Sequence, residues 1–355
     1  MLDDGLFSRG KKSGIGHHVV NLFESLEPIA DCTIASHDAI FQLPRFVRKW
    51  GYIFASNNPS QYTGYDLIHH LGNYIPRARG EGKHVMTVYD FSMLRYPETI
   101  PITWRHFNQH SFRNSIERAD GLITISSAMR DELMETFPRI SHSQVYVCPP
   151  GLRNTMQASG RLSSGIHELG LAPFSYFLFV GDLTRRKNIE FLLRTFIAAK
   201  KQHRLNEETL LVLVGKKAWG YGDFSHLISE ENGIRIIGYL ADDKIAELYS
   251  HCKALLYPSV YEGFGIPIVE AMAQGAIIIA SDIPTTRELH ETHNRQSFLF
   301  KLGATEDLVG LLEMVEQRGS TIRQTLNYGD LSVYTYEKIA RAHLEIYRKL
   351  CEGTS

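Results

Sequence analysis

The chain alternates between short apolar runs of strand length and longer segments whose apolar side chains recur at helical spacing. In the first half the strand-like runs lie at residues 32–35, 66–69, 84–88, 121–125 and 145–147, and helical patterns lie at 19–26, 104–118 and 127–135. This alternation predicts an α/β architecture, in which helices cover both faces of a parallel sheet.

A second alternating series follows a break at Pro149-Pro150-Gly151 and a linker-like stretch at residues 157–165. Its strand signals lie at 176–180, 210–214, 234–237, 254–257 and 276–280, and its helical signals at 188–201, 242–251, 267–274 and 334–350. We therefore expect an N-terminal domain at 1–165 and a second domain at 166–333, both doubly wound. Two such domains facing each other would place a ligand cleft at the carboxyl ends of their strands.

Composition narrows the class of protein further. A length of 355 residues suits two domains of roughly 150 residues each. The 38 basic and 39 acidic side chains nearly balance, which gives no reason to expect nucleic acid as a partner. Apolar runs fall short of the ~20 residues of a membrane span, Met1 opens no secretory signal, and four widely spaced cysteines favour a reducing compartment. We expect a soluble, cytoplasmic enzyme.

The window at residues 258–275 combines a strand end, a glycine-rich turn and a helix start. Pro267 suits the first helical position, so the backbone N–H groups of residues 264–266 are expected to face an anion such as phosphate. Glu262 on the turn and Glu270 in the first helical turn could each hold a vicinal diol of a sugar or ribose. Alternatively, Glu270 only complements the helix dipole and Glu262 is solvated.

Two further windows place cations or glycines at a helix start. Arg185, Arg186 and Lys187 lie beside a helix N-terminus, where cations oppose the helix dipole. A diphosphate leaving group would explain them, because its charge grows as its bond breaks; a solvated basic turn is the alternative. Gly14 and Gly16 precede another helical pattern and allow close backbone approach to a ligand, or they form an ordinary strand-to-helix turn.

The run Glu262-Gly-Phe-Gly-Ile-Pro267, with Glu270 eight positions after Glu262, resembles the signature of the retaining glycosyltransferases of family 4. The resemblance covers nearly the whole chain, through residues 13–16, 85–90, 95–98, 119–126, 149–151, 181–188, 213–216, 238–240 and 248–249. It implies the GT-B fold, in which two Rossmann-like doubly wound parallel-sheet domains face each other across a cleft. It also implies that a C-terminal helix at 334–355 crosses back to the N-terminal domain.

The same resemblance implies roles on the donor side. Glu270 should accept hydrogen bonds from the ribose hydroxyls of the nucleotide, and Glu262 should lie by the donor sugar. Lys187, with Arg186, should grip the diphosphate. The other implied donor-binding residues are Gly14, Gly16, Gly181, Gly215, Lys216, Tyr239, Leu240, Gly263, Phe264, Gly265 and Ile266.

On the acceptor side the resemblance implies roles for Tyr89 and Ser126, and it adds Asp90 to the catalytic set of Glu262, Lys187 and Arg186. The chain departs from the family pattern at two positions. Members often have His where Tyr89 stands, which puts the family's His contact to the donor sugar in doubt. Some members have Arg where this chain has Asp182, which leaves Arg186 as the cation there.

No metal and no cofactor are expected. His290 and His293 have one residue too few between them for the helical zinc protease motif, and His69 and His70 would point to opposite faces of a strand. No two Asp residues stand two apart, so the Asp-x-Asp device of metal-dependent sugar transferases is missing. The patch at 43–50 mixes cations with aromatics, and it either touches a membrane surface or lipid-linked acceptor or forms a solvated helix face.

We therefore expect a retaining, metal-independent enzyme that moves a hexose from a nucleoside diphosphate sugar to a hydroxyl of a saccharide or lipid-linked acceptor. GDP-mannose is the first candidate donor, because the subgroup with Arg-Lys-Asn at 186–188 is rich in mannosyltransferases of bacterial surface polysaccharides. The alternatives are a transferase that uses a UDP-sugar, a sugar-nucleotide epimerase or hydrolase on the same fold, and an inactive nucleotide-sugar-binding subunit. Peripheral contact at the inner face of the membrane stays open.

Overall fold

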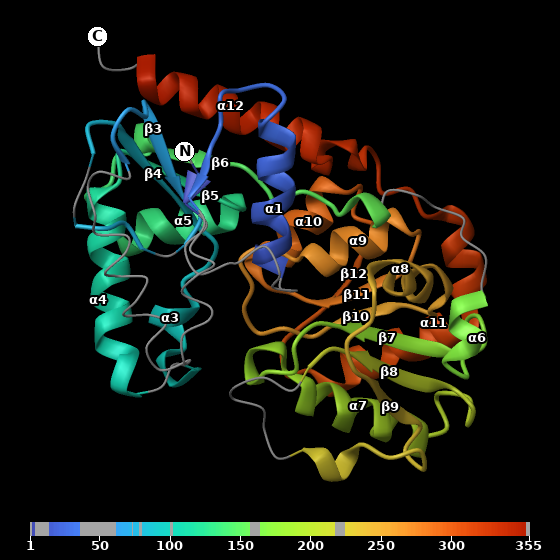
Figure 1. Cartoon of the computed structure of the whole chain (residues 1–355). Helices are drawn as coiled ribbons and strands as arrows, with labels where there is room; N and C mark the ends of the chain where they lie inside the picture. The colour runs from blue at the N-terminus through green and yellow to red at the C-terminus, as the bar shows by residue number, and fades with distance from the viewer. Residues whose placement is uncertain are drawn as a thin grey trace. The chain divides into compact units, whose positions relative to one another are not determined.

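The computed structural model describes residues 2–3, 14–35, 62–72, 74–77, 80–99, 102–156, 164–216 and 224–352 (Figure 1). The chain forms two compact units, the first from residues 1–153 and 332–355 and the second from residues 154–331. The sequence pattern places this boundary later, near residue 165. The structural boundary is earlier because the 3-10 helix η5 (Asn154–Met156) is tied to the second unit, where the Met156 carbonyl accepts a hydrogen bond from Gln274 Nε2 at 2.8 Å.

In its described part, the first unit has six parallel strands in the order β2-β1-β3-β4-β5-β6. They are β1 (Leu2–Asp3), β2 (Ile34–Ala35), β3 (Leu67–His70), β4 (Lys83–Val88), β5 (Gly121–Thr124) and β6 (Val145–Val147). The helices are α1 (Gly14–Leu26), α3 (Ser92–Arg95), α4 (Ile102–Arg118), α5 (Ser127–Thr136) and α12 (Tyr336–Glu352), with 3-10 turns η3 (Pro97–Thr99) and η4 (His142–Gln144). Every residue of β3 and β5 is buried, as expected for a parallel sheet covered on both faces.

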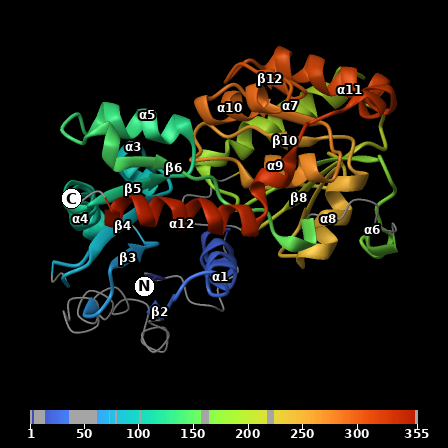
Figure 2. The same cartoon turned by 90° about the horizontal axis from the view of Figure 1, so that it is seen from above.

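Helix α12 returns the end of the chain to the first unit, where it packs against α1 (Figure 2). Its buried side chains recur every three to four residues, which is the spacing of one helix face. Ile339 and Ala340 of α12 share a core with Val19 and Leu22 of α1. The first unit is therefore completed by residues that follow the whole second unit in sequence.

A polar cluster lies inside the first unit, where α1, β3 and α12 meet. His69 of β3 is hydrogen-bonded at 2.7 Å to the hydroxyls of both Tyr347 and Thr87. His18 of α1 and His343 of α12 are buried beside it, and the ring centroids of His69 and His343 lie 5.7 Å apart. Burial lowers the pKa of His18 to about 3 and of His343 to about 4, and it also lowers the pKa of His69. All three imidazoles are therefore neutral at pH 7.

In its described part, the second unit has six parallel strands in the order β12-β11-β10-β7-β8-β9. They are β7 (Tyr176–Val180), β8 (Leu210–Val214), β9 (Ile234–Ile237), β10 (Leu255–Tyr257), β11 (Ile278–Ser281) and β12 (Phe298–Phe300). The helices are α6 (Ser164–Glu168), α7 (Ile189–Lys201), α8 (Asp242–His251), α9 (Ile266–Ala273), α10 (Pro284–Thr292) and α11 (Thr305–Thr325), with 3-10 turns η6 (Arg185–Lys187), η7 (Ser225–Leu227) and η8 (Leu331–Tyr334), the last ending in the first unit. Throughout the described part of the chain, no helix combines the length and apolar character that crossing a membrane requires.

The strand order of the second unit changes direction once, between β7 and β10. From β7 the chain proceeds outward through β8 to β9, and from β10 it proceeds outward on the other side through β11 to β12. Neighbouring parallel strands that lead away from each other leave a crevice at their carboxyl ends, where ligands of open α/β sheets bind. The loops after β7 and β10 border that position.

The neutral histidines predict that the first unit loses stability in acid. The unfolded chain binds these protons with a pKa near 6.5, while the folded unit resists them, so stability falls as pH drops below about 6.5. His18 and His343 should each remove about 2 kcal/mol between pH 7.5 and 5. Urea unfolding at pH 7.5 and 5 measures this loss. His343→Leu should reduce the pH dependence, whereas His110→Gln, at an exposed position of the same unit, should not. Equal stability at the two pH values would contradict the account.

Candidate active site

The loops that follow β7 and β10 are joined directly in the second unit. Strands β7 and β10 are neighbours, with Leu178 paired to Leu255. Beyond their ends, the backbone N–H of Val260 donates to the carbonyl of Arg186 at 2.9 Å. This contact brings the basic turn after β7 to the acidic, glycine-rich turn after β10.

Three charged side chains meet at this junction. The Glu262 carboxylate accepts from Arg186 Nη1 through Oε2 at 2.8 Å and lies 2.6 Å from Lys187 Nζ through Oε1. Arg186 Nη1 also donates to the carbonyl of Tyr261 at 2.7 Å. We call Arg186, Lys187 and Glu262 the ion triad. The structure thus brings together three of the four residues expected to be catalytic.

Burial and charge oppose each other within the ion triad. Burial raises the pKa of Glu262, but Lys187 and Arg186 outweigh it and lower that pKa to about 2. Burial lowers the pKa of Lys187, and the nearby Glu262 carboxylate works against this shift. Glu262 is 7% exposed and Lys187 is 9% exposed. The alternatives of a solvated Glu262 and a solvated basic turn are therefore wrong for these two residues.

Tyr257 also contacts Lys187, and it is not among the site residues predicted from the sequence. Its hydroxyl accepts from Lys187 Nζ at 3.2 Å, and the ammonium lies 4.9 Å from the centre of the Tyr257 ring. Burial raises the pKa of Tyr257, so the phenol stays protonated. An aromatic residue at the last position of β10, directly before the glycine-rich turn, is the signal that could have identified it.

Helix α9 begins at the end of the same turn. Gly265 caps it with φ +126°, a conformation that favours glycine, and a Cβ there would come within 3.1 Å of Leu289. The helix starts at Ile266, one residue earlier than predicted, so Pro267 is its second residue. The first N–H groups of a helix have no carbonyl partner within it, and they carry the positive end of the helix dipole.

Glu270 lies in the second turn of α9, and the expectation that it occupies the first turn is wrong. The reason is the earlier helix start, which makes Glu270 the fifth helical residue. Its side chain is 1% exposed and accepts a hydrogen bond from the hydroxyl of Tyr249 at 3.1 Å. A role confined to the dipole at the helix N-terminus is therefore excluded.

Two glycines let the ends of β7 and β8 approach closely. The N–H of Gly181 donates to the carbonyl of Val214 at 2.9 Å. Gly215 has φ +152°, and a Cβ on it would lie 2.0 Å from the Gly181 carbonyl oxygen. Gly215 therefore requires glycine for close backbone approach, whereas Gly181 favours glycine through its φ of +147°.

The edge of the sheet continues to three further residues that were expected to bind the donor. Lys216 Nζ lies 5.1 Å from the centre of the Tyr239 ring, which is 40% exposed. Leu240 follows and is half-buried. The N–H of Leu183 donates to the carbonyl of Lys216 at 2.8 Å, which ties this edge to the turn that carries the ion triad.

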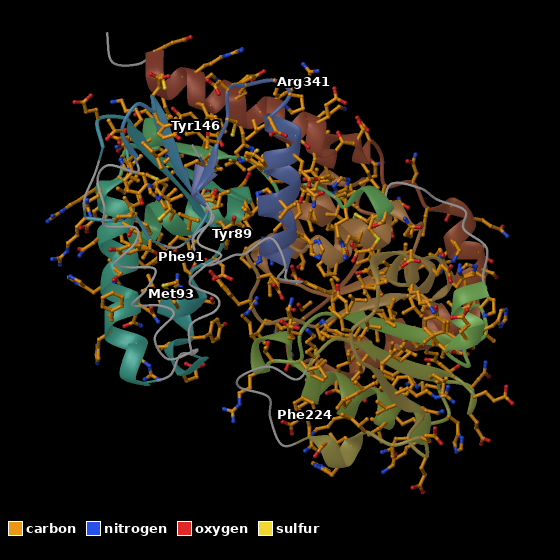
Figure 3. The ribbon with its side chains drawn as sticks, in the orientation of Figure 1. Tyr89, Phe91, Met93, Tyr146, Phe224 and Arg341 are labelled. Carbon is orange, nitrogen blue, oxygen red and sulfur yellow. The ribbon has the colours of Figure 1, made fainter. Side chains whose placement is uncertain are left out.

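The other predicted site residues belong to the first unit. Asp90 accepts through Oδ1 from the N–H of Ser92 at 2.9 Å, and Ser126 caps α5 by accepting from the N–H of Met129 at 3.1 Å. Both side chains thus have local structural partners. Tyr89, labelled in Figure 3 just after β4, is buried, and its hydroxyl has no hydrogen-bond partner among the described residues.

The predicted glycine loop and the basic aromatic patch of the first unit lie partly or wholly outside the described residues. Gly14 is the first residue of α1, and Gly16 is buried within that helix. Residues 11–13 and the patch at 43–50 lie outside the described residues. Among the residues that the structure does describe, no three His, Cys, Asp or Glu side chains are grouped as a metal ion would require.

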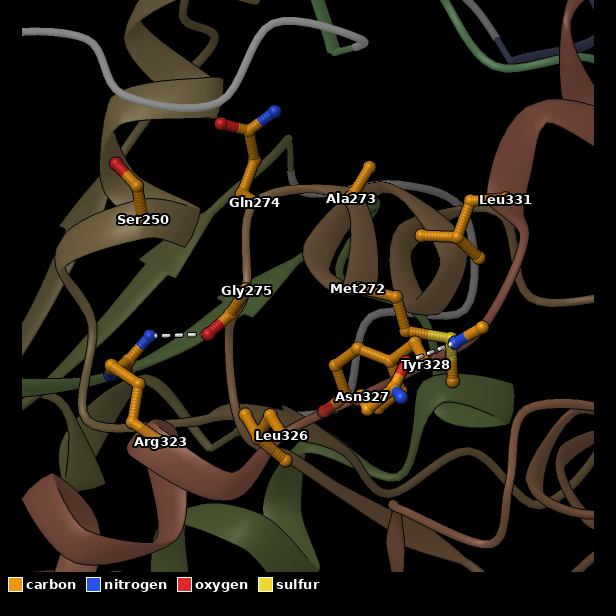
Figure 4. Close-up of a pocket in the computed structure, with 11 residues that line it drawn as sticks. Ser250, Met272, Ala273, Gln274, Gly275, Arg323, Leu326, Asn327, Tyr328 and Leu331 are labelled. Carbon is orange, nitrogen blue, oxygen red and sulfur yellow. Dashed lines mark hydrogen bonds between the residues drawn. The ribbon is translucent and has the colours of Figure 1, made fainter.

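A cavity of about 460 Å³ also lies in the second unit (Figure 4). It borders Gly275 and Arg323, near the amino ends of β10 and β11 and thus away from the ion triad. Arg323 donates to the carbonyls of Gly275 and Cys252, and the Tyr328 hydroxyl donates to the carbonyl of Ala276. These polar groups serve the fold of the unit.

The sequence of this chain is similar to a family of glycosyl transferases and to two bacterial enzymes. Residues 172–329 match the family model described as glycosyl transferases group 1. An O-antigen chain mannosyltransferase B from Escherichia coli is 27% identical over 236 residues, which are 63% of this chain and only 59% of that protein. An alpha-maltose-1-phosphate synthase from Mycolicibacterium smegmatis is 27% identical over 319 residues, 81% of this chain and 77% of that protein.

A solved structure matches almost the whole chain. The Anabaena protein HepE, solved in complex with UDP-glucose, aligns with a TM-score of 0.73 at 18% identity and covers 98% of both chains. This likeness shows the fold, and it confirms the predicted α/β class and GT-B organisation.

The ion triad predicts a specific stability effect. Glu262→Gln removes the carboxylate that two largely buried cations share, which should lower the free energy of unfolding of the second unit by about 3 kcal/mol. Glu190→Gln is the matched control, because Glu190 pairs with Arg194 on the exposed face of α7 and should cost about 0.5 kcal/mol or less. Chemical denaturation measures both. If the two variants were equally stable, the triad would not hold the loops together.

Proposed function

We propose that this chain, whose residues 172–329 match the family model of the glycosyl transferases group 1, transfers a hexose from a nucleoside diphosphate sugar to an acceptor hydroxyl. The observation that carries the proposal is the ion triad at the switch point of the second unit. Two cations and one carboxylate leave a net positive charge there, at the edge of the sheet where open α/β folds bind ligands.

The proposed chemistry uses that charge. As the bond between the sugar and the diphosphate breaks, negative charge gathers on the leaving phosphate, and Lys187 and Arg186 stabilise it. Tyr257 and Glu262 keep the Lys187 ammonium in place, so little rearrangement is needed when the charge develops. The first N–H groups of α9 add the positive end of a helix dipole beside the same loop.

We assign the two carboxylates to different parts of the donor. Glu262 is held by cations and serves the end that carries sugar and phosphate, while Glu270 is held by Tyr249 and serves the ribose hydroxyls. A glycosidase-like hydrolase needs two carboxylates that face each other across one scissile bond. The separate partners of Glu262 and Glu270 therefore favour a transferase over the hydrolase alternative.

We infer that the donor is GDP-mannose, with a UDP-sugar as second candidate. The first inference is supported by the similarity to an E. coli mannosyltransferase, and the second by the similarity in fold to a protein solved with UDP-glucose. Retention of configuration and independence from metal are part of the proposal, as is an acceptor in surface polysaccharide or glycolipid synthesis. The proposed place of reaction is the cytoplasm, at or near the inner face of the membrane.

The proposal predicts which substitution stops the reaction. The purified chain is incubated with GDP-mannose or UDP-glucose, with and without mono- and oligosaccharide acceptors, and release of GDP or UDP is measured. Lys187→Ala should lower the rate at least about 100-fold, because it removes a preorganised cation from the departing phosphate. Lys201→Ala, at an exposed position at the end of α7, should leave the rate unchanged.

Three outcomes would count against the transferase. Full activity in Lys187→Ala would remove the ion triad from the mechanism. Rapid complete turnover without any acceptor would favour a hydrolase, and donor binding without release of nucleotide under any condition would favour the inactive subunit.

A further inference from the structure

Glu270 is a buried carboxylate whose orientation depends on a second buried side chain. It lies within α9 with 1% of its surface exposed, and a charge so enclosed is costly unless it is hydrogen-bonded. The Tyr249 hydroxyl donates to its Oε2 at 3.1 Å, and Tyr249 itself is fully buried.

Tyr249 is presented by a rigid part of the unit. It lies on α8, which packs against α9, and its carbonyl accepts from the Cys252 thiol at 3.2 Å. A donor on a packed helix holds its partner more tightly than one on a loop.

We propose that Tyr249 is a positioning residue that sets the preference of this protein for ribonucleotide over deoxyribonucleotide donors. By binding Oε2 from one side, the phenol fixes the plane of the Glu270 carboxylate. A carboxylate oxygen can accept more than one hydrogen bond, so the carboxylate keeps acceptor positions for the two neighbouring hydroxyls of a ribose. This inference rests on the proposed function, in which Glu270 receives the ribose.

Tyr249 contacts Glu270, and its effect on the nucleotide is exerted through that contact. Without the phenol hydroxyl, the buried Oε2 loses a donor and the carboxylate turns toward another one. The acceptor positions then no longer match the two ribose hydroxyls, while the cations that bind the diphosphate are unchanged. The loss should therefore affect ribose recognition alone.

The test compares ligands that differ only in the ribose. The affinities of GDP, UDP and their 2′,3′-dideoxy analogues are measured by calorimetry for the full chain and for Tyr249→Phe. The unaltered protein should prefer the ribonucleotide by about tenfold or more, because a site built around hydroxyls rejects analogues that lack them. Tyr249→Phe should remove most of that preference by weakening the ribonucleotide, with the dideoxy affinity unchanged.

Tyr176→Phe is the matched control. It also removes one hydroxyl from a buried tyrosine bonded to α8, but it acts at the start of β7, at the opposite end of that strand from Gly181. Its preference for the ribonucleotide should equal that of the unaltered protein. Replacement of Tyr249 by 4-aminophenylalanine, which keeps a donor at the same position, should retain the preference.

Each result separates this inference from the proposed function. If the unaltered chain binds no nucleoside diphosphate, the proposed function fails first. If it binds them and Tyr249→Phe weakens both members of each pair equally, or changes neither, the positioning role is overturned. Should Tyr249→Phe not fold, 4-fluorophenylalanine at this position fills the volume of the hydroxyl without donating and gives the same comparison.

Discussion

The shared carboxylate of Glu262 is the interaction on which the rest of the second unit depends. It joins Arg186 and Lys187 from the turn after β7 to the turn after β10, at the point where the strand order changes direction. The charges of Glu262 and Lys187 can be buried there only because each has an opposite partner within hydrogen-bonding distance. Two neighbouring features accompany this cluster. Gly215 approaches Gly181 closely at the ends of β7 and β8, and the Tyr257 hydroxyl accepts a hydrogen bond from Lys187.

The two units use buried polar groups in different ways. In the second unit the ion triad is charged, and it lies in the loops that follow β7 and β10. In the first unit they are neutral histidines inside the core, and His69 finds its partner Tyr347 on α12, 278 positions along the chain. That cluster therefore secures the return of the chain to the first unit and makes the unit sensitive to acid.

Much of the fold could be predicted because it depends on local patterns. Short apolar runs located most strands, apolar side chains at helical spacing located most helices, and the spacing of Glu262, Gly265 and Glu270 located the principal turn. What the sequence could not predict are partners chosen by the sheet order. Three hydrogen bonds of this kind join distant segments. They run from Tyr249 to Glu270, from Lys187 to Tyr257, and from Gln274 to Met156 near the unit boundary. The predicted position of Glu270 in the helix was also wrong, because α9 starts one residue earlier than predicted.

The central claim is that the ion triad recognises a diphosphate, and one calorimetric comparison tests it most directly. The affinities of GDP and UDP are compared with those of GMP and UMP for the full chain and for Lys187→Met. The account predicts that the diphosphates bind at least about tenfold more tightly than the monophosphates, and that this difference largely disappears in the variant. Equal binding of diphosphate and monophosphate by the unaltered protein, or an undiminished difference in Lys187→Met, would contradict it.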